Sequence, residues 1–398
     1  MRDALVDIFV AGVRRADPGR AVADAVAAMD RPDLILALGK AARAMAAPAL
    51  ARFPGVPALV VTNPENAGPL PGAELRLGAH PVPDATSEAA GRALLEAAGR
   101  LRAGERALAL ISGGGSALAV APVEGVGLDD KAQVSRLLLG AGADIRETNL
   151  VRQALSRLKG GGLARAAAPG RLDALILSDV IGDDPAAIAS GPTVAPLGTA
   201  ADARATLERL GLWGRVPASV RAALSRARPP GPVPPSGWRL VGSNALSVEA
   251  MAAACPEARV DPVPLEGDVA EAAARVAADA ARGAGTTLWG GETTVVVRGP
   301  GRGGRNQELA LRVALALAGE RRPWAFLSGG TDGRDGPTDA AGAVVDGGTL
   351  ARMAAAGADP RAALARSDSH AALAASGDLL RIGGTGTNVA DLQVLRLG

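Results

Sequence analysis

Several residue types are scarce in this chain of 398 residues, and each scarcity excludes a class of structure. A single cysteine, Cys255, excludes a disulfide framework within the chain and a cysteine-ligated metal cluster. Aromatic residues make up 2% of the sequence, so base stacking on a nucleic acid is not expected. No apolar run reaches the roughly 18 residues of a membrane span, and acids interrupt the apolar N-terminal segment, which predicts an amphipathic helix rather than a signal peptide. These patterns predict a soluble, cytoplasmic protein without nucleic-acid or membrane partners.

Lysine is also scarce, because three lysines stand against 40 arginines in a chain whose net charge is +2. This bias is typical of a genome rich in G and C, in which a surface lysine is replaced by arginine at little cost. A lysine that remains is therefore expected where a compact ammonium group is required. The three lysines are Lys40, Lys131 and Lys159.

The length and the hydrophobic content of 48% are sufficient for two domains with sizeable cores. The clearest boundary is segment 226–237, where five prolines in twelve residues exclude a helix or a central strand. We therefore predict an N-terminal domain over residues 1–228, a Pro-rich linker over 229–237 and a C-terminal domain over 238–398.

Short apolar runs alternate with helical patterns before the linker, which predicts a Rossmann-like α/β domain with a parallel sheet covered on both faces. The ligand of such a sheet lies at the carboxyl ends of its strands. The predicted strands are 34–39, 58–62, 74–78, 107–112 and 174–180, and the predicted helices are 41–53, 87–103, 131–142 and 147–162.

The rhythm after the linker is less regular and predicts a second α/β domain with a mixed sheet. The motif "GGETT" between two β-like runs predicts a hairpin there. The predicted strands of this half are 239–243, 258–264, 286–291, 293–299, 324–330, 341–346, 378–384 and 391–397.

The segment "ALALISGGGSALAV" follows the order strand, glycine loop, helix. Gly113, Gly114 and Gly115 let the backbone approach a ligand closely, and the start of the helix offers free N–H groups. Together with Ser112 and Ser116, this loop predicts an anion-binding site. A plain tight turn between strand and helix is the alternative.

Two lysines lie in informative positions. Lys40, in "LALGKAARAMA", follows a strand and begins a helix, where an ammonium group can meet phosphate or carboxylate oxygens. In "ETNLVRQALSRLKGGGLAR", the spacing of Arg152, Ser156 and Lys159 predicts that they share one helix face that lines the active site. Solvated surface positions are the alternative for both segments.

The segment "ILSDVIGDDPAAIASGPT" places Asp179 at a strand end, where a metal-binding or basic carboxylate is found in α/β sites. Asp183 and Asp184 precede a proline, so one of them is expected to cap a helix. The two histidines, His80 and His370, are expected to make structural hydrogen bonds and do not predict a zinc site.

A second glycine loop, in "VVVRGPGRGGRNQELALRVALALAG", has two readings. Gly299, Gly301 and Gly304 formally match the G-x-G-x-x-G fingerprint of dinucleotide-binding proteins. Against this reading, Pro300 removes a backbone N–H group, and the next strand-end acid, Asp332, comes later than the usual distance of about 20 residues.

The same loop carries Arg302 and Arg305, followed by Asn306 and Glu308. Guanidinium groups bind phosphoryl and carboxylate groups through paired hydrogen bonds. We therefore interpret this loop as a site for a transferring phosphoryl group or a substrate carboxylate rather than for a nicotinamide nucleotide. The chain lacks the Walker A motif and the protein-kinase motifs, so a phosphoryl transfer would belong to another class.

The segment "LSGGTDGRDGPTDAAGAVVD" carries four aspartates and five glycines after a strand-like apolar run. Asp332 and Asp335, nearest the strand end, are predicted to hold Mg²⁺ beside a phosphate. Asp339 is expected to be secondary, and Asp346, after the next strand, is expected to be structural. A solvated surface loop is the alternative.

Several of these motifs together resemble the glycerate 2-kinase family whose C-terminal half is the MOFRL domain. The motifs that carry the resemblance are "GKAARAMA", "ISGGGSAL", "NLVRQALSRLKGGGLA", "LSDVIGDDPAAIASGPT", "GPGRGGRNQELAL", "LSGGTDGRDGPTDAAGA" and "GGTGTNVADL". The resemblance covers nearly the whole chain. It implies two α/β domains with the active site in the cleft between them, and ATP-dependent, Mg²⁺-dependent phosphorylation of D-glycerate to 2-phosphoglycerate.

The resemblance also implies that the lysine of the "GK" motif and an arginine of the C-terminal domain are essential. The lysine matches Lys40, and the arginine matches Arg305 or its neighbour Arg302. We expect Lys40 to neutralise the transferring phosphoryl group, and Arg305 with the Gly113–Ser116 loop to hold anionic groups. The carboxylates expected to bind Mg²⁺ or to accept the hydroxyl proton are Asp179, Asp332 and Asp335.

The alternative function is an NAD(P)H-dependent hydroxypyruvate reductase, a name given to similar proteins and supported here by the Gly299–Gly304 loop. A binding protein without catalysis is a third reading, but it leaves the clustered aspartates without a purpose. The sequence leaves open the choice between 2-phosphate and 3-phosphate, the preferred nucleotide and the presence of a homodimer.

Overall fold

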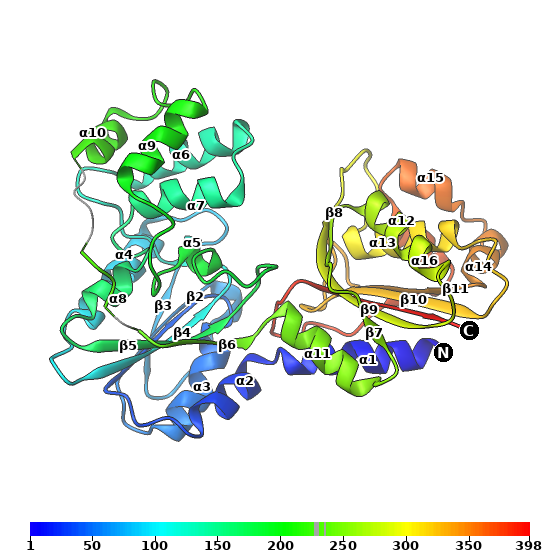
Figure 1. Ribbon diagram of the computed structural model, residues 1–398, viewed down its shortest axis with the longest axis horizontal. Coiled ribbons are helices and arrows are strands. Elements are labelled where there is room, and N and C mark those ends of the chain that lie inside the picture. Colours follow the sequence, from blue (N-terminus) through cyan, green and yellow to red (C-terminus); the bar gives the residue numbers. More distant parts are fainter. Residues whose placement is uncertain (227–230, 235) are drawn as a thin grey trace. The chain divides into compact units, whose positions relative to one another are not determined.

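The computed structural model describes residues 1–226, 231–234 and 236–398. These residues form two compact units (Figure 1). The central unit comprises Pro18–Val241, and the split unit combines Met1–Asp17 with Gly242–Gly398. Among the described residues, no helix is long and apolar enough to span a bilayer.

A six-stranded sheet is the framework of the central unit, and its strand order is β3-β2-β1-β4-β5-β6. The pairs β1–β2, β2–β3, β1–β4 and β4–β5 are parallel, which confirms the Rossmann-like α/β prediction. The strands are β1 (Leu34–Leu38), β2 (Ala58–Thr62), β3 (Ala73–Leu77), β4 (Arg106–Ser112), β5 (Arg171–Leu177) and β6 (Trp238–Gly242).

Helices cover both faces of this sheet because its strands bury side chains on both sides. Leu36 and Leu38 of β1 join a cluster that contains Leu94 of α4, whereas the alternating Ile35 and Ala37 are buried toward the opposite face. The covering helices are α2 (Pro18–Val26), α3 (Ala42–Arg52), α4 (Ala85–Ala98) and α8 (Gly162–Ala166).

Four further helices form a separate layer with its own small core, and they lie together in Figure 1. They are α6 (Leu128–Gly140), α7 (Ile145–Ala154), α9 (Ala200–Arg209) and α10 (Ala218–Arg226). Val134, Val151, Leu207 and Leu224 contribute to the core, one from each helix. Short helical segments complete the unit at α5 (Gly115–Leu118), η1 (Pro64–Asn66) and η2 (Ile188–Ser190).

The split unit contains a mixed seven-stranded sheet, as the sequence predicts. Its order is β12-β11-β10-β13-β9-β7, with β8 also paired to β9. Neighbours from β12 to β9 run antiparallel, whereas β7 and β8 run parallel to β9. The strands are β7 (Arg259–Val260), β8 (Leu265–Asp268), β9 (Gly285–Thr294), β10 (Trp324–Gly330), β11 (Gly342–Asp346), β12 (Leu379–Leu380) and β13 (Asp391–Leu397).

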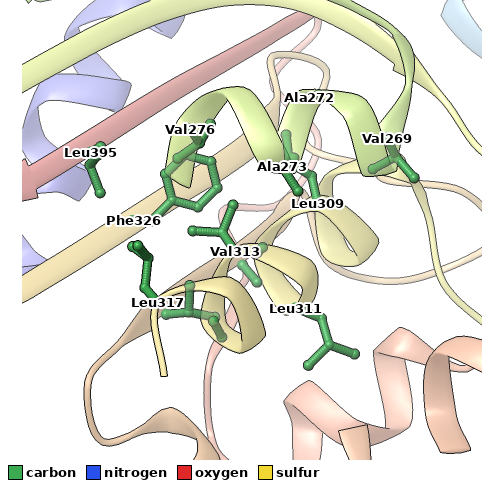
Figure 2. Packing of buried hydrophobic residues seen from close by; sticks show 14 of the residues in the cluster. Val269, Ala272, Ala273, Val276, Leu309, Leu311, Val313, Leu317, Phe326 and Leu395 are labelled. Carbon is green, nitrogen blue, oxygen red and sulfur yellow. The ribbon is translucent and has the colours of Figure 1, made fainter. Parts of the chain in front are cut away.

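Two helical layers cover this second sheet. On one face, α1 and α11 bury Phe9 and Met251 against Leu327 and Val394. On the other face, α12 and α13 pack against Phe326 of β10 and its neighbours, as Figure 2 shows. The helices are α1 (Arg2–Arg15), α11 (Asn244–Ala254), α12 (Val269–Ala280), α13 (Arg305–Ala316), α14 (Thr349–Ala355), α15 (Pro360–Ala365) and α16 (Ser369–Ala375).

The unit boundaries lie elsewhere than the predicted domain bounds of 1–228 and 238–398. The single N-terminal helix expected from the sequence is two helices, and Pro18 begins the second, which belongs to the other unit. Strand β6 lies after the linker but completes the first sheet beside β5. Within the predicted linker 229–237, residues 229, 230 and 235 lie outside the described residues, so the linker stays a prediction.

Two local predictions are wrong. The hairpin at "GGETT" is absent from the described fold, since β9 continues through these residues as one strand and residues 295–299 form a loop. The helix predicted over 147–162 ends at Ala154, and Ser156 forms an isolated bridge with Pro122. The bridge between Ser156 and a distant segment of the same chain outweighed the local helical preference of residues 155–162.

Candidate active site

The loops after β1 and β4 meet at the point where the strand order of the central sheet reverses. The chain leaves β1 toward β2 and leaves β4 toward β5, so their carboxyl ends form the crevice that binds ligands in such sheets. The backbone N–H of Lys40 donates to the carbonyl of Gly113 at 2.9 Å, and the N–H of Ala41 donates to Oγ of Ser112 at 3.1 Å. The first glycine loop and Lys40 are therefore held side by side.

Glycine is required here because side chains from other segments press against the loop. A Cβ atom on Gly113 would lie 1.9 Å from Oδ2 of Asp179. A Cβ on Gly114, whose φ is +80°, would lie 2.9 Å from Cγ of Lys40 and 3.4 Å from Cδ2 of His80. The loop thus gathers an ammonium, a carboxylate and an imidazole within one small region.

The pKa of the His80 imidazole is lower than that of an exposed histidine, which favours the neutral form. Its partial burial and the nearby charge of Lys40 lower its pKa, although Glu65 opposes this effect. The side chain of Lys40 itself is exposed, so it is accessible to a ligand.

A chain of hydrogen bonds continues from the glycine loop to the segment after α7. The ammonium of Lys159 donates to the carbonyl of Ser116 at 2.9 Å and lies 2.6 Å from its Oγ. The Ser116 hydroxyl lies 2.9 Å from the Ser190 hydroxyl. The Ser190 hydroxyl in turn donates to Oδ1 of Asn149 at 3.0 Å. Ser190 has a φ of 59°, so the backbone accepts a sparsely populated conformation at this point.

The predicted helix face of Arg152, Ser156 and Lys159 does not exist, because the helix ends before Ser156. The turn that replaces it still directs Lys159 toward Ser116, and Oγ of Ser156 accepts the N–H groups of Leu158 and Lys159 at 3.2 Å each. The structure therefore brings Lys159 to the glycine loop by a different route from the predicted one.

Three cations cluster near this turn, and no ion pair joins them to a carboxylate of the described chain. Lys131 of α6 donates to the carbonyl of Leu155 at 2.8 Å, close to Arg152 and Lys159. Burial and the charge of Arg152 lower the pKa of Lys131 to about 7. Burial and the other two cations hold the pKa of Lys159 well below its usual value. An anion bound at this cation cluster would reduce its electrostatic cost.

The split unit places Arg305 in a network of carboxylates at the start of α13. Its Nε lies 2.6 Å from Oδ2 of Asp391 and its Nη2 lies 3.0 Å from Oδ1, a bidentate pair. Its Nη1 also lies 2.9 Å from Glu292 at the far end of β9. Burial raises the pKa of Asp391 to about 6, although the guanidinium opposes this shift. The charge of Arg305 thus favours the ionised form of Asp391 against the effect of burial.

Asp335 caps the start of the same helix. Its Oδ1 accepts the N–H of Asn306 at 3.1 Å and its Oδ2 accepts the N–H of Gln307 at 2.8 Å. The Asn306 amide oxygen accepts the Ser328 hydroxyl at 2.6 Å, so Asn306 is held in place within the fold. Burial raises the pKa of Asp335, opposed by these N–H groups. Asp335 thus has fewer free acceptor positions than the metal prediction requires.

The other predicted residues of this unit are dispersed around the helix start. Asp332 follows β10, and its Oδ1 accepts the N–H of Arg334 at 2.9 Å. Arg302 donates from Nη2 to the carbonyl of Pro337 at 3.0 Å. Glu308 is nearly buried and pairs with Arg312 one turn along the helix at 2.7 Å, so it serves the helix rather than the Arg305 network.

The second glycine loop packs against the chain itself. Cβ atoms on Gly299 and Gly301 would lie 2.8 Å and 2.6 Å from the carbonyl oxygen of Arg366, and one on Gly304 would lie 2.3 Å from Cγ of Asp335. These close approaches explain why the three positions are glycine. The glycines are therefore not evidence that the loop binds a pyrophosphate. In the central sheet, the turn after β1 carries Gly39 and Lys40 in place of a G-x-G-x-x-G fingerprint.

The remaining acids and the second histidine have structural partners. Asp339 accepts from His370 at 2.8 Å and from Arg381 at 2.9 Å, and these hydrogen bonds lower its pKa to about 2. Asp346 pairs with Arg2 at 2.8 Å, which agrees with the structural role expected for it. In the part of the chain that the structure describes, no group of three or more His, Cys, Asp or Glu side chains could hold a metal ion alone.

Sequence reasoning missed four residues of these networks. Lys131 could have been singled out by the scarcity of lysine, and Asn149 by that of asparagine. Ser190 and Asp391 carried no local signal, since their partners lie 41 and 86 residues away.

Comparisons with known proteins agree with these observations. Residues 4–225 match the family described as "Domain of unknown function (DUF4147)", and residues 285–391 match the MOFRL family. The chain is 37% identical to the "D-glycerate 2-kinase" of Thermotoga maritima, over 98% of this chain and 97% of that protein. It is 43% identical to a protein of Agrobacterium vitis named "Putative hydroxypyruvate reductase", over 100% of this chain and 94% of that one.

A solved structure extends this likeness to the fold. The crystal structure of a glycerate kinase from Thermotoga maritima matches with a TM-score of 0.93 and 35% identity, over 100% of this chain and 99% of that one. The chain therefore belongs to the glycerate 2-kinase family, in which a DUF4147 domain is combined with a MOFRL domain.

Proposed function

We propose that this protein transfers the γ-phosphoryl group of ATP to the 2-hydroxyl of D-glycerate. The observation that carries the proposal is the position of Lys40 beside the Gly113–Gly115 loop, at the reversal point of the central sheet. Phosphoryl transfer depends mainly on positioning and on neutralisation of charge. An exposed ammonium next to a glycine loop, with a further cation cluster nearby, suits both requirements.

Each residue of the central unit has a role in this proposal. Lys40 neutralises the transferring phosphoryl group, and Lys159 with Arg152 contributes positive charge toward the anions held at the glycine loop. Asp179, which lies against Gly113, accepts the proton of the substrate hydroxyl or binds the metal. His80 stays a structural neighbour of Lys40, because it is expected to be neutral at physiological pH.

Arg305 is proposed to hold the carboxylate of glycerate. Asp391 and Glu292 fix the guanidinium in one orientation, and arginine carries more N–H donors than these contacts use. A guanidinium that is held in one orientation can meet a planar carboxylate with paired hydrogen bonds. Arg302 remains the rival, but its side chain is occupied by a backbone carbonyl at the surface.

Mg²⁺ is proposed to bind together with the nucleotide, in the way that kinases commonly use it. Mg²⁺ is usually held by one or two protein carboxylates, with waters and the phosphates of the nucleotide completing its shell. Asp179 of the central unit and Asp332 of the split unit are separate candidates for such a carboxylate, and Asp335 is less suited because both of its oxygens accept N–H groups of α13. When bound, Mg²⁺ would neutralise charge on the phosphates.

The decisive experiment is incubation with ATP, Mg²⁺ and D-glycerate, followed by identification of the product. We expect ADP and 2-phosphoglycerate. A parallel assay with hydroxypyruvate and NADH or NADPH should show no loss of nicotinamide absorbance, because the Gly299–Gly304 loop is filled by its own chain. Formation of 3-phosphoglycerate would correct the regiochemistry, and reductase turnover without phosphorylation would refute the proposal.

A further inference from the structure

A cavity of about 750 Å³ lies in the central unit and shares Ser156 and Lys159 with the contacts described above. It is open on one side and is lined by the end of α7, the segment around Pro196 and Gly198, and α10. Pockets for small molecules and cofactors commonly have volumes between about 300 and 1,000 Å³. The cavity is therefore large enough for a nucleoside.

One part of the cavity wall is strongly basic. Lys159 is 4% exposed and lines the cavity, and Arg165 and Arg226 line it too, against one carboxylate, Glu124. The Nη1 atom of Arg165 is buried and has no hydrogen-bond partner among the described residues. The guanidinium also donates to the carbonyl of Gly160, and its positive charge near the cavity wall would favour an anionic ligand.

Small apolar residues form much of the rest of the wall. Ala154, Pro196, Ala222 and Ala223 contribute surfaces without polar side-chain atoms. The cavity thus combines an apolar surface that suits a nucleobase with cations that suit phosphates.

Lys159 connects this cavity to the candidate active site. The same ammonium group that lines the cavity donates to the Ser116 carbonyl and lies 2.6 Å from the Ser116 hydroxyl, at the end of the glycine loop. The other end of that loop lies against Lys40. If the phosphates of a bound ligand passed Lys159, the end of the phosphate chain would lie toward Lys40, the residue proposed to neutralise the γ-phosphoryl group.

We propose that this cavity binds the nucleoside part of ATP, with the polyphosphate directed past Lys159 toward the Gly113–Gly115 loop. The inference rests on the proposed kinase function and assigns its nucleotide site to the central unit alone. Gln153, Ser156 and Ser219 also line the cavity. Their polar side-chain atoms already bond to other groups of the described chain, so these three residues are not free to read the edge of a base. The site is therefore expected to accept GTP as well as ATP, with affinities within about tenfold of each other.

The test is to fill the cavity with one side chain. Ala222→Phe on α10 adds a ring to the apolar wall, and Ala218→Phe adds the same ring at an exposed position of that helix. Binding is measured by the fluorescence of methylanthraniloyl-ADP without glycerate, and kinetics are measured with both substrates. We expect Ala222→Phe to weaken analogue binding and raise the KM for ATP at least tenfold, with the KM for glycerate within twofold of the wild type.

A second measurement needs no variant and so does not depend on the folding of Ala222→Phe. Hydrogen–deuterium exchange of the unaltered protein should slow in segments 153–160 and 218–226 when ADP is added. No protection there, or unchanged analogue binding by a folded Ala222→Phe protein, would overturn the cavity assignment while wild-type turnover leaves the kinase proposal standing. If the wild-type protein neither binds the analogue nor phosphorylates glycerate, both proposals fail.

Discussion

The guanidinium of Arg305 and the carboxylate of Asp391 form a bidentate ion pair across 86 residues of sequence. The Asp391 side chain is fully buried, whereas that of Arg305 is 33% exposed. Arg305 thus has one side fixed in the fold and another that can meet a ligand. Arg305, one of the two arginines that the family resemblance offers as the essential one, is therefore also a structural residue, and loss of activity on its replacement would have two separable causes.

Asp391→Asn is expected to destabilise the protein, because it leaves Arg305 without the charge of its partner. Breaking a fully buried pair costs about 3–5 kcal/mol, and the exposure of Arg305 reduces the expected loss to about 2–3 kcal/mol. The free energy of unfolding from urea denaturation measures this effect. Glu208→Gln, which breaks the exposed pair with Arg204, is the control and should cost less than about 1 kcal/mol. Equal effects of both variants would contradict the structural role of Asp391.

Lys40→Ala is expected to remove most of the turnover while leaving the fold intact. Removal of a group that stabilises transition-state charge typically costs about 10²–10³-fold in kcat. Since the side chain is exposed, the free energy of unfolding should change by less than about 0.5 kcal/mol. Lys40→Arg should rescue little activity, because a guanidinium is wider than an ammonium and differs in geometry. A kcat near that of the wild type for Lys40→Ala would refute its proposed role.

Gly113→Ala tests the contact between the glycine loop and Asp179. The new methyl group would lie 1.9 Å from the carboxylate, so one of the two must move. A displacement of about 1 Å near reacting groups can cost about 10²-fold in rate, which we expect to appear in kcat. Gly140→Ala is the matched control, since a Cβ there meets no atom within 4 Å. Retention of full activity by Gly113→Ala would show that the position of Asp179 does not matter for turnover.

The cation cluster predicts a characteristic dependence of stability on pH. The pKa of Lys131 is about 7 in the folded protein, compared with about 10.4 for an exposed lysine. Between these values the unfolded chain binds more protons, so the free energy of unfolding should rise with pH. At lower pH the lysine is charged in both states, and the folded state bears the full cost of its burial.

Lys131→Met should flatten this rise without abolishing it, because Lys159 remains and its pKa is shifted in the same direction. Urea denaturation between about pH 7 and pH 10 should show the wild type gaining at least about 1 kcal/mol relative to the variant. Arg136→Met, at an exposed position of the same helix, should leave the slope unchanged. Parallel curves for wild type and Lys131→Met would contradict the lowered pKa of Lys131.

Local patterns in the sequence were sufficient for the elements that carry the candidate site. The apolar runs before Gly39 and Gly113 form β1 and β4 as predicted, whereas the site roles expected for Lys40 and Lys159 from the scarcity of lysine stay predictions. The strand predictions are confirmed because a buried parallel strand is apolar throughout, and the loop at its end must be made of small or polar residues.

Helical spacing predicted that Lys159 lies on a helix face with Arg152 and Ser156. Lys159 does lie beside the glycine loop, but a turn and not a helix places it there. The helical pattern continues past Ala154 in the sequence, whereas the chain turns there so that Ser156 can bridge to Pro122. Likewise, β9 runs straight through the residues that suggested a hairpin, because β13 and β8 supply partners along its length. Such pairings join segments far apart in the sequence, and local propensity does not contain them.

The sequence by itself determined the α/β class, the strand-end loops and the family to which the motifs belong, since all of these follow from residue type and local order. Tertiary structure alone decided that helix α1 packs in the same unit as α11, that Asp391 holds Arg305, and that three basic side chains gather without an ion-pair partner among the described residues. The physical reason is that burial and charge depend on what lies opposite in space. A buried ion pair or an unpaired cation cluster acquires its energy only when distant segments exclude water together.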